Sequence, residues 1–294
     1  MSSDLYKCTV DGEGIIPPDV KTIQFGAFRK CLELKSVRIP EGVREIGSGA
    51  FIGCSALKSV EIPDSVTKIG ERAFANCSGL VSVKLPERLS LILDSTFKGC
   101  TSLSSVDIPA SVTRIGKSSF EECTSLSSID IPRGVLEISS FAFQNCGGLT
   151  VLNLSDTVEW IGYGAFEGCS GLSSVEFPMI DNADSSGNSW GKYSTIHDKA
   201  FGGCTGLKDI HFSGKMSIHP YAFEKCTGLT TLEIPAEMTL ENYAFKDCSG
   251  LRYVKINIQS TRFTDLTFNG CSNLPTAATY DRIHNIAEFK TAEN

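Results

Sequence analysis

The chain has 294 residues, 41% of them hydrophobic, and 27 basic against 34 acidic side chains give a formal net charge of −7 at pH 7. This acidic balance, without a basic stripe, argues against nucleic-acid binding. No apolar run is long enough for a transmembrane helix, and the polar first residues show no secretory signal, which favours a cytoplasmic location. The sequence also lacks a nucleophile elbow, a P-loop, an HExxH motif and a dinucleotide fingerprint, so we expect no enzymatic activity and no cofactor.

The cysteines form the strongest pattern in the chain, because all 12 lie on one repeating register. The first eight are each 23 residues apart, one longer step follows, and the last steps are 22, 22 and 23 residues. The positions are Cys8, Cys31, Cys54, Cys77, Cys100, Cys123, Cys146, Cys169, Cys204, Cys226, Cys248 and Cys271. A fixed period of this length predicts a solenoid, in which one short unit is stacked many times.

Other positions keep the same register, so that the unit reads AFxxCxxLxxVxIPxxVxxIGxx. Residues 57–62 end in apolar–polar alternation, which indicates a half-buried strand, and Pro63 ends it because proline cannot donate to a sheet ladder. Val66 and Ile69 mark a second extended piece. Residues 73–77 place Phe and Cys one helical turn apart, which predicts a short helical turn. Eleven such phenylalanines predict about eleven coils of 22–23 residues, in a β-rich α/β solenoid.

The repeat pattern divides the chain into three parts. Residues 1–17 read as a degenerate N-terminal capping coil, because they keep the cysteine register and lose the leucine. Residues 18–274 form the solenoid, with a loop insertion at 179–193. Residues 275–294 leave the repeat and form a C-terminal cap or tail.

The repeat resembles the BspA-like (Treponema-type) leucine-rich repeat over residues 18–274, and residues 49–63 match its pattern throughout. The resemblance implies a curved solenoid with parallel strands on its concave face and short helical turns. Family members include bacterial cell-surface antigens and act in adhesion, host attachment and protein binding. The resemblance therefore implies a non-catalytic protein and a surface or secreted location, and it brings no catalytic residues to this chain.

We expect the cysteines to be reduced and buried, acting as small apolar residues with a weak S–H donor. A disulfide ladder is the alternative, since neighbouring coils would bring the cysteines to about the right separation. However, parallel side chains in register point the same way, which opposes the dihedral angle that a disulfide needs. One cysteine per coil also gives a row of sulfurs, which does not suit a tetrahedral metal site.

The longest departure from the repeat follows Pro178, where the coil carries 12 extra residues. The segment 179–193 is rich in Asp, Asn, Ser and Gly, which predicts a surface loop. Trp190 and Tyr193 lie within it and are candidate binding residues, because aromatic anchors dominate protein interfaces. The alternative is a tolerated insertion whose aromatic rings fold back onto the coil.

The outward positions of the predicted concave strands form a second candidate site. Early coils alternate in charge along this row, and the row then turns acidic and is flanked by serines. The candidate binding residues are Asp107, Asp130, Asn153, Glu176 and His211. The small neighbours leave room for the surface of a basic or peptide partner, although the same pattern is typical of a solvated face.

Apolar residues at positions that are usually polar form a third candidate. Trp160 and Tyr163 are the main members, and Leu91, Leu136 and Phe141 lie on the same or adjacent coils. An exposed apolar cluster indicates an interaction site, and local packing is the equal alternative.

A histidine pair is the fourth departure. His197, His219 and Glu241 replace the glycine that follows the isoleucine in three successive coils, and Asp198 lies beside them. Two imidazoles and a carboxylate can hold a metal ion. Turn positions are usually exposed and tolerant of change, so our main expectation is that no metal binds.

Together these patterns predict a protein-binding or adhesion scaffold that uses the concave sheet and the inserted loop. We expect a monomer that binds a protein partner, on a host or another cell, and neither nucleic acid nor a membrane span. Two alternatives remain open: an intracellular scaffold for protein complexes, and a carbohydrate- or metal-binding module through residues 179–197.

Overall fold

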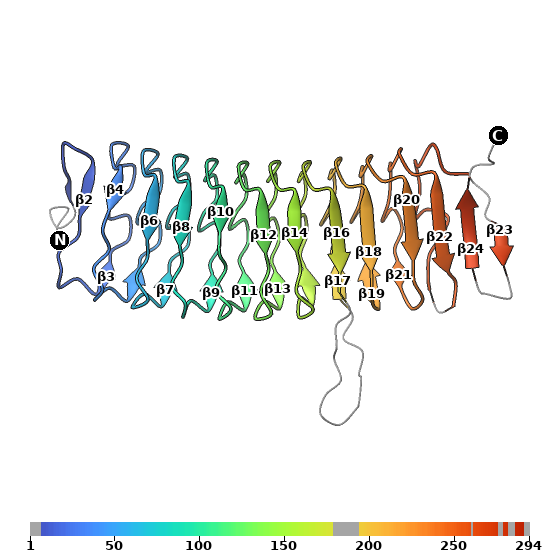
Figure 1. The fold of residues 1–294 in the computed structure, drawn as a ribbon, viewed down its shortest axis with the longest axis horizontal. Coiled ribbons are helices and arrows are strands. Elements are labelled where there is room, and N and C mark those ends of the chain that lie inside the picture. The colour runs from blue at the N-terminus through green and yellow to red at the C-terminus, as the bar shows by residue number, and fades with distance from the viewer. Residues whose placement is uncertain (1–6, 179–193, 260, 276–278, 282–285, 291–294) are drawn as a thin grey trace, which may run out of the picture.

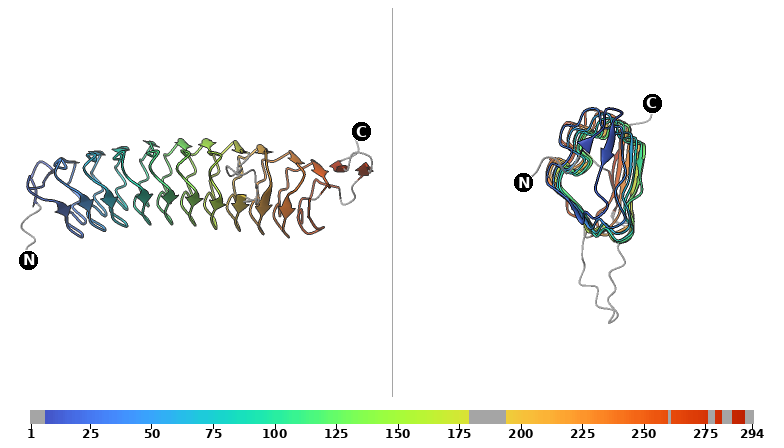
Figure 2. Two further views of the ribbon diagram at one scale, coloured as in Figure 1. Left: turned by 90° about the horizontal axis from the view of Figure 1, so that it is seen from below. Right: turned by 90° about the vertical axis from the view of Figure 1, so that its left-hand side faces the viewer.

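The computed structural model describes residues 7–178, 194–259, 261–275, 279–281 and 286–290. They form an elongated stack in which about ten coils carry both strands, so the expected number of about eleven complete coils is not confirmed (Figure 1). Seen along the axis of the stack, successive coils superpose on one another (Figure 2). A fixed repeat length produces this shape because each coil contacts only its neighbours.

The first strand of each coil is formed by the segment that corresponds to residues 57–62. These strands make up the upper row of Figure 1, which we call the first row. Its members pair in parallel within several short ladders, and their valines, isoleucines and leucines point inward while the residues between them are exposed or half-buried. The first row comprises β2 (Glu13–Ile15), β4 (Ser36–Val37), β6 (Ser59–Glu61), β8 (Ser82–Lys84), β10 (Ser105–Val106), β12 (Ser128–Asp130), β14 (Val151–Asn153), β16 (Ser174–Phe177), β18 (Asp209–Phe212), β20 (Thr231–Ile234) and β22 (Tyr253–Asn257).

The second strand of each coil comes from the Val-x-x-Ile segment and forms the second row. These strands also pair in parallel, as one ladder of three strands and one of seven. The second row comprises β3 (Thr22–Ile23), β5 (Glu45–Ile46), β7 (Lys68–Ile69), β9 (Leu91–Ile92), β11 (Arg114–Ile115), β13 (Glu137–Ile138), β15 (Trp160–Ile161), β17 (Ser194–Ile196), β19 (Met216–Ile218) and β21 (Thr239–Leu240).

The segment from Phe to Cys is a series of turns, and the prediction of short helical turns is wrong for the described residues, none of which is helical. The amide of Phe74 donates to the carbonyl of Thr96 in the next coil, at 2.9 Å, and so cannot bond within its own segment. Arg72 and Asn76 have φ values of 57° and 58°. These left-handed conformations interrupt any helix, because consecutive residues of a right-handed helix need negative φ.

The core is a set of ladders that run the length of the stack. From Phe28 to Phe268, each repeat phenylalanine stacks on the next with ring centroids 5.0–5.6 Å apart. The leucine that follows each cysteine is fully buried from Leu34 to Leu251. Offset stacking at this spacing adds to the burial of each ring, so neighbouring coils stabilise one another.

The cysteines join this core as thiols. All 12 are free, and those from Cys54 to Cys271 donate their S–H to the carbonyl of the phenylalanine in the preceding coil, at 3.0–3.3 Å. Burial raises the pKa of Cys100 and of Cys146 to about 12. A thiol with so high a pKa is neutral at physiological pH and is a poor nucleophile.

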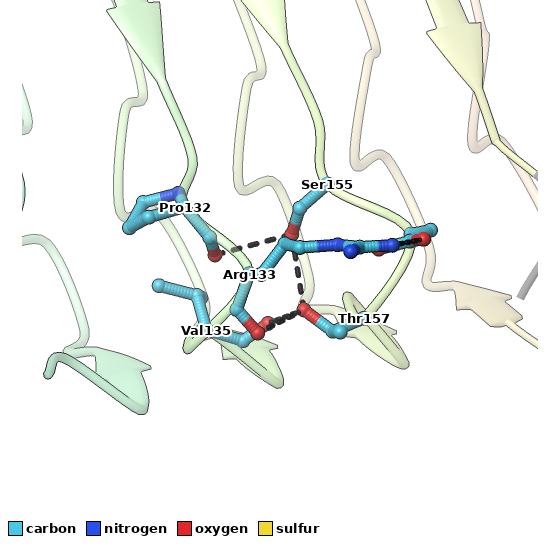
Figure 3. Close-up of polar contacts among 6 residues, drawn as sticks. Pro132, Arg133, Val135, Ser155 and Thr157 are labelled. Carbon is cyan, nitrogen blue, oxygen red and sulfur yellow. Dashed lines mark hydrogen bonds and ion pairs between the residues drawn. The ribbon is translucent and has the colours of Figure 1, made fainter. Parts of the chain in front are cut away.

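Serine and threonine side chains fasten the turns between the two rows. Ser155 donates to the carbonyl of Pro132, and Thr157 donates to the carbonyls of Arg133 and Val135, all in the preceding coil (Figure 3). Two coils earlier, Ser111 takes the position of Thr157 and donates to the carbonyls of Glu87 and Leu89. These bonds satisfy carbonyls that the strand ladders leave open.

The ends of the stack depart from parallel pairing. β1 (Lys7–Cys8) pairs antiparallel with β2, and β24 (Ile286–Lys290) pairs antiparallel with both β22 and β23 (Thr279–Asp281). At the C-terminal end, β24 thus occupies the edge of β22 and keeps it from pairing with another chain.

Candidate functional site

The outward row of the first-row strands is exposed along most of its length, and its charges are arranged unevenly. Near one end, Lys84 Nζ lies 3.1 Å from Glu61 Oε1. Near the other, Lys255 Nζ lies 3.9 Å from Glu233 Oε1. Cross-strand pairs of this kind balance the charge of those coils.

Between those ion pairs, the row is acidic from Asp107 to Glu176. Asp130 lies beside Asn153 on the neighbouring strand and accepts a hydrogen bond from its amide. Glu176 lies beside His211 in the next pair of strands. The structure therefore sets the five predicted residues along one exposed row, where no lysine or arginine occupies the row positions between Lys84 and Lys255.

Small side chains border this acidic stretch. The neighbouring outward positions are exposed serines in most coils, namely Ser36, Ser59, Ser82, Ser105, Ser128 and Ser174. Val151 takes that position between the last two and is 47% exposed. Such a border leaves the carboxylates accessible from the side as well as from above.

A depression of about 440 Å³ lies where the outward row meets the C-terminal strands. His211, Glu233 and Lys255 line it from the first row, and Ile286 of β24 lines it from the returning strand. The sequence gives no sign of this hollow, because the repeat does not encode the antiparallel return of β24. This depression adjoins the acidic stretch and is lined by both an acidic and a basic side chain, Glu233 and Lys255.

The apolar cluster lies along the second row. Leu136 and Trp160 are each 46% exposed and Tyr163 is 41% exposed. The rings of Phe141 and Tyr163 meet edge to face with centroids 5.2 Å apart. Leu91 does not join them, because β11 and β13 separate its strand from that of Trp160.

The ring of Trp160 lies next to the rings of two histidines. Its ring centroid lies 3.8 Å from that of His197, which in turn lies 4.5 Å from that of His219. His219 Nδ1 is 3.5 Å from Asp198 Oδ1, and His219 Nε2 is 4.0 Å from Glu241 Oε1. The structure thus brings the predicted His197, His219 and Glu241 side by side, with Asp198 against the ring of His219.

His197 is a half-buried member of this group of residues. Burial lowers the pKa of its imidazole, the neighbouring His219 lowers it further, and Asp198 acts in the opposite direction. Its Nε2 is buried and has no hydrogen-bond partner among the residues that the structure describes. A buried polar atom without a partner is uncommon, and it often marks a site for an unseen ion or water.

The inserted segment 179–193, with Trp190 and Tyr193, lies outside the described residues. Its flanks are described: Phe177 stacks on Phe212 at 5.4 Å and Thr195 pairs with Trp160. Within the described residues, no helix has the length and apolarity of a membrane span.

The stacked parallel strands, with Phe, Cys and Leu ladders inside, define a leucine-rich-repeat solenoid. Residues 3–117, 90–189 and 185–290 match the model described as the BspA type leucine rich repeat region, in six copies. The chain therefore belongs to the BspA-type leucine-rich repeat family. No curated protein matches the chain.

Solved structures agree with this fold. A leucine-rich repeat protein from Bacteroides ovatus is 28% identical with a TM-score of 0.69, over 88% of this chain and 70% of that one. A leucine rich cell surface protein from Faecalibacterium prausnitzii is 24% identical with a TM-score of 0.54, over 91% and 90%. The leucine-rich repeat protein of T. pallidum is 26% identical with a TM-score of 0.50, over 76% and 86%.

Proposed function

We propose that the protein is a scaffold that binds a basic segment of another protein along the outward row of its first-row strands. The observation that carries the proposal is the acidic stretch from Asp107 to Glu176, set between two ion-paired ends. Three coil steps of about 4.8 Å separate these two carboxylates, so the stretch spans about 15 Å. That length suits an extended peptide or one face of a helix.

Physical features of the scaffold support this role. The ladders of the core hold the carboxylates at fixed spacing, so that little conformational entropy is lost when a partner binds. Carboxylates on a regular row attract a basic partner and speed its encounter, and this attraction weakens as salt is added. The family resemblance extends the proposal to adhesion, in which the partner belongs to another cell or a host.

The experiment compares the wild-type chain with the triple variant Asp107→Lys, Asp130→Lys, Glu176→Lys. Each chain is immobilised, and retained proteins are quantified by mass spectrometry at low and high salt. We expect partners of the wild type to be lost on the triple variant and to elute with salt.

The matched control is Glu41→Lys, Glu71→Lys, Glu87→Lys, which changes the net charge equally at exposed positions outside the outward row. It should retain the wild-type partners. Equal loss on both variants would show that net charge alone attracts the partners, and the proposed site would then be wrong.

A further inference from the structure

We propose that His197, Asp198 and His219 form a binding site for a single divalent transition-metal ion of the Zn²⁺ type. Each residue offers one ligand atom, and these three atoms all lie within 4.8 Å of one another. Two imidazoles and one carboxylate are a ligand set that Zn²⁺ uses in proteins, with the fourth position open to water or another ligand.

The spacing of the ligand atoms is close to that of a bound site. Ligands held about 2.0–2.1 Å from a tetrahedral Zn²⁺ lie roughly 3.3 Å from each other. His219 Nδ1 and Asp198 Oδ1 are already 3.5 Å apart. The remaining separations are at most 4.8 Å. They reach this value if side-chain rotations bring the ligand atoms up to about 1.5 Å closer together, which half-buried side chains can do.

The surroundings leave His197 free to ligate. Its ring packs against those of Trp160 and His219, with centroid distances of 3.8 and 4.5 Å. Its Nε2 forms no hydrogen bond with any described group, and a metal ion would give the ring a partner. Metal binding at this position displaces no existing hydrogen bond of Nε2.

Glu241 supplies the outer support that such sites need. It lies 4.0 Å from His219 Nε2, the ring nitrogen that does not face Asp198. When His219 ligates through Nδ1, its Nε2–H donates toward this carboxylate. Carboxylates that accept from a ligating histidine fix the orientation of the ring and raise metal affinity about 10–100-fold.

The first test is a calorimetric titration of the full chain with Zn²⁺, after metal is removed with a chelator and the chelator is dialysed away. We expect one ion per chain for the wild type and for the control His284→Ala, which removes a histidine that belongs to neither candidate site. His219→Ala and Asp198→Asn should weaken binding at least tenfold, and Glu241→Gln about 10–100-fold. An unchanged affinity in His219→Ala would overturn the proposal.

A second measurement keeps the test valid if a variant misfolds. In the background Trp190→Phe, the chain has Trp160 as its one remaining tryptophan. Cu²⁺ bound at the three residues should quench this fluorescence with a saturable curve, and excess Zn²⁺ should reverse the quenching. Cobalt should give an absorption spectrum without a thiolate band. A thiolate band would place the ion on cysteine and overturn the proposal, as would fluorescence that Cu²⁺ leaves unchanged.

Discussion

The coils before residue 178 and those after residue 194 share one core and differ at one surface row. Phe166 stacks on Phe201 across the insertion at 5.0 Å, the same centroid distance as between Phe51 and Phe74. After the second-row strand, however, four of the seven earlier coils have a glycine, namely Gly47, Gly70, Gly116 and Gly162, whereas the later coils have His197, His219 and Glu241.

The difference shows where a repeat can change. A Cβ added at Gly70 would lie 2.5 Å from the backbone nitrogen of Ser48, and one at Gly162 would lie 2.7 Å from that of Ser140. The later coils hold a side chain at the same register and keep the backbone bond, since His197 N donates to Ile161 O at 2.9 Å. A new polar row can therefore be placed on the stack without altering its core.

The largest expected effect tests whether the core is one unit in both regions. Unfolded thiols ionise near pH 9.0, while burial raises the pKa of Cys100 and of Cys146 to about 12. Above pH 9 the unfolded chain therefore releases protons that the folded chain retains. The free energy of unfolding should fall by about 1.4 kcal/mol per pH unit for each such thiol until pH 12.

We expect cooperative alkaline unfolding in that window, followed by circular dichroism, and no contribution from these thiols below pH 9. Alkylation with iodoacetamide and mass spectrometry should show Cys100 and Cys226 becoming reactive together. If Cys226 reacts at a lower pH than Cys100, the two regions unfold separately and the shared core is not one cooperative unit.

The second prediction compares one ring of the ladder from each region. Phe120→Ala and Phe201→Ala should each lower the free energy of unfolding by about 3–5 kcal/mol, because each leaves a cavity between two stacked rings. Chemical denaturation measures both. The control is Phe25→Ala, whose side chain is 72% exposed and whose loss should cost less than about 0.5 kcal/mol. A much smaller cost at Phe201 would mean that the insertion loosens the core.

The third prediction concerns the row that differs. Gly70→Ala should cost about 1–3 kcal/mol, because the added carbon meets the backbone of the preceding coil. His219→Ala should change the free energy of unfolding by less than about 1 kcal/mol, since its half-buried ring makes contacts at the surface. Thermal melts of the metal-free proteins measure both, and equal costs would remove the distinction between the two regions.

The smallest effect is expected at the exposed ion pairs, which both regions contain. Lys84→Ala removes the contact with Glu61, and Lys255→Ala removes the contact with Glu233. Exposed ion pairs contribute little to the free energy of unfolding, since water and salt screen the attraction between their charges. Neither variant should shift the melting temperature measurably at physiological salt, and a clear shift in one alone would identify a coupled charge network on that side.

The sequence predicted the features that recur from coil to coil. The place of Phe120 in the core follows from its register, and so does the closeness of His197 and His219, which are 22 residues apart. The turn at 73–77 could not be predicted, since a Phe–Cys spacing of three suits a helix as well as a turn. Arg72 and Asn76 are left-handed without being glycines, and only the glycines that other coils have at these positions, such as Gly49 and Gly53, mark the break in the sequence.

The remaining features depend on contacts that no repeat encodes. The hollow at His211 and Lys255 requires β24 to return antiparallel, and the sequence indicated only that residues 275–294 leave the repeat and form a cap or tail. The burial of His197 Nε2 without a partner among the described residues depends on side-chain rotation, which the repeat does not specify. Register gives the coil on which a residue lies, whereas the partner of each ring atom depends on side-chain rotation.

The hydrogen bond from a cysteine thiol to the preceding coil keeps its length when more residues separate the donor from the acceptor. Cys204 lies 38 residues after Phe166 and Cys77 lies 26 after Phe51, yet their S–H···O distances are 3.2 and 3.1 Å. The connection between β16 and β17 is 12 residues longer than in other coils, and the core contacts on both sides keep their distances. New segments can therefore be inserted there in evolution, and a peptide can be grafted there by design.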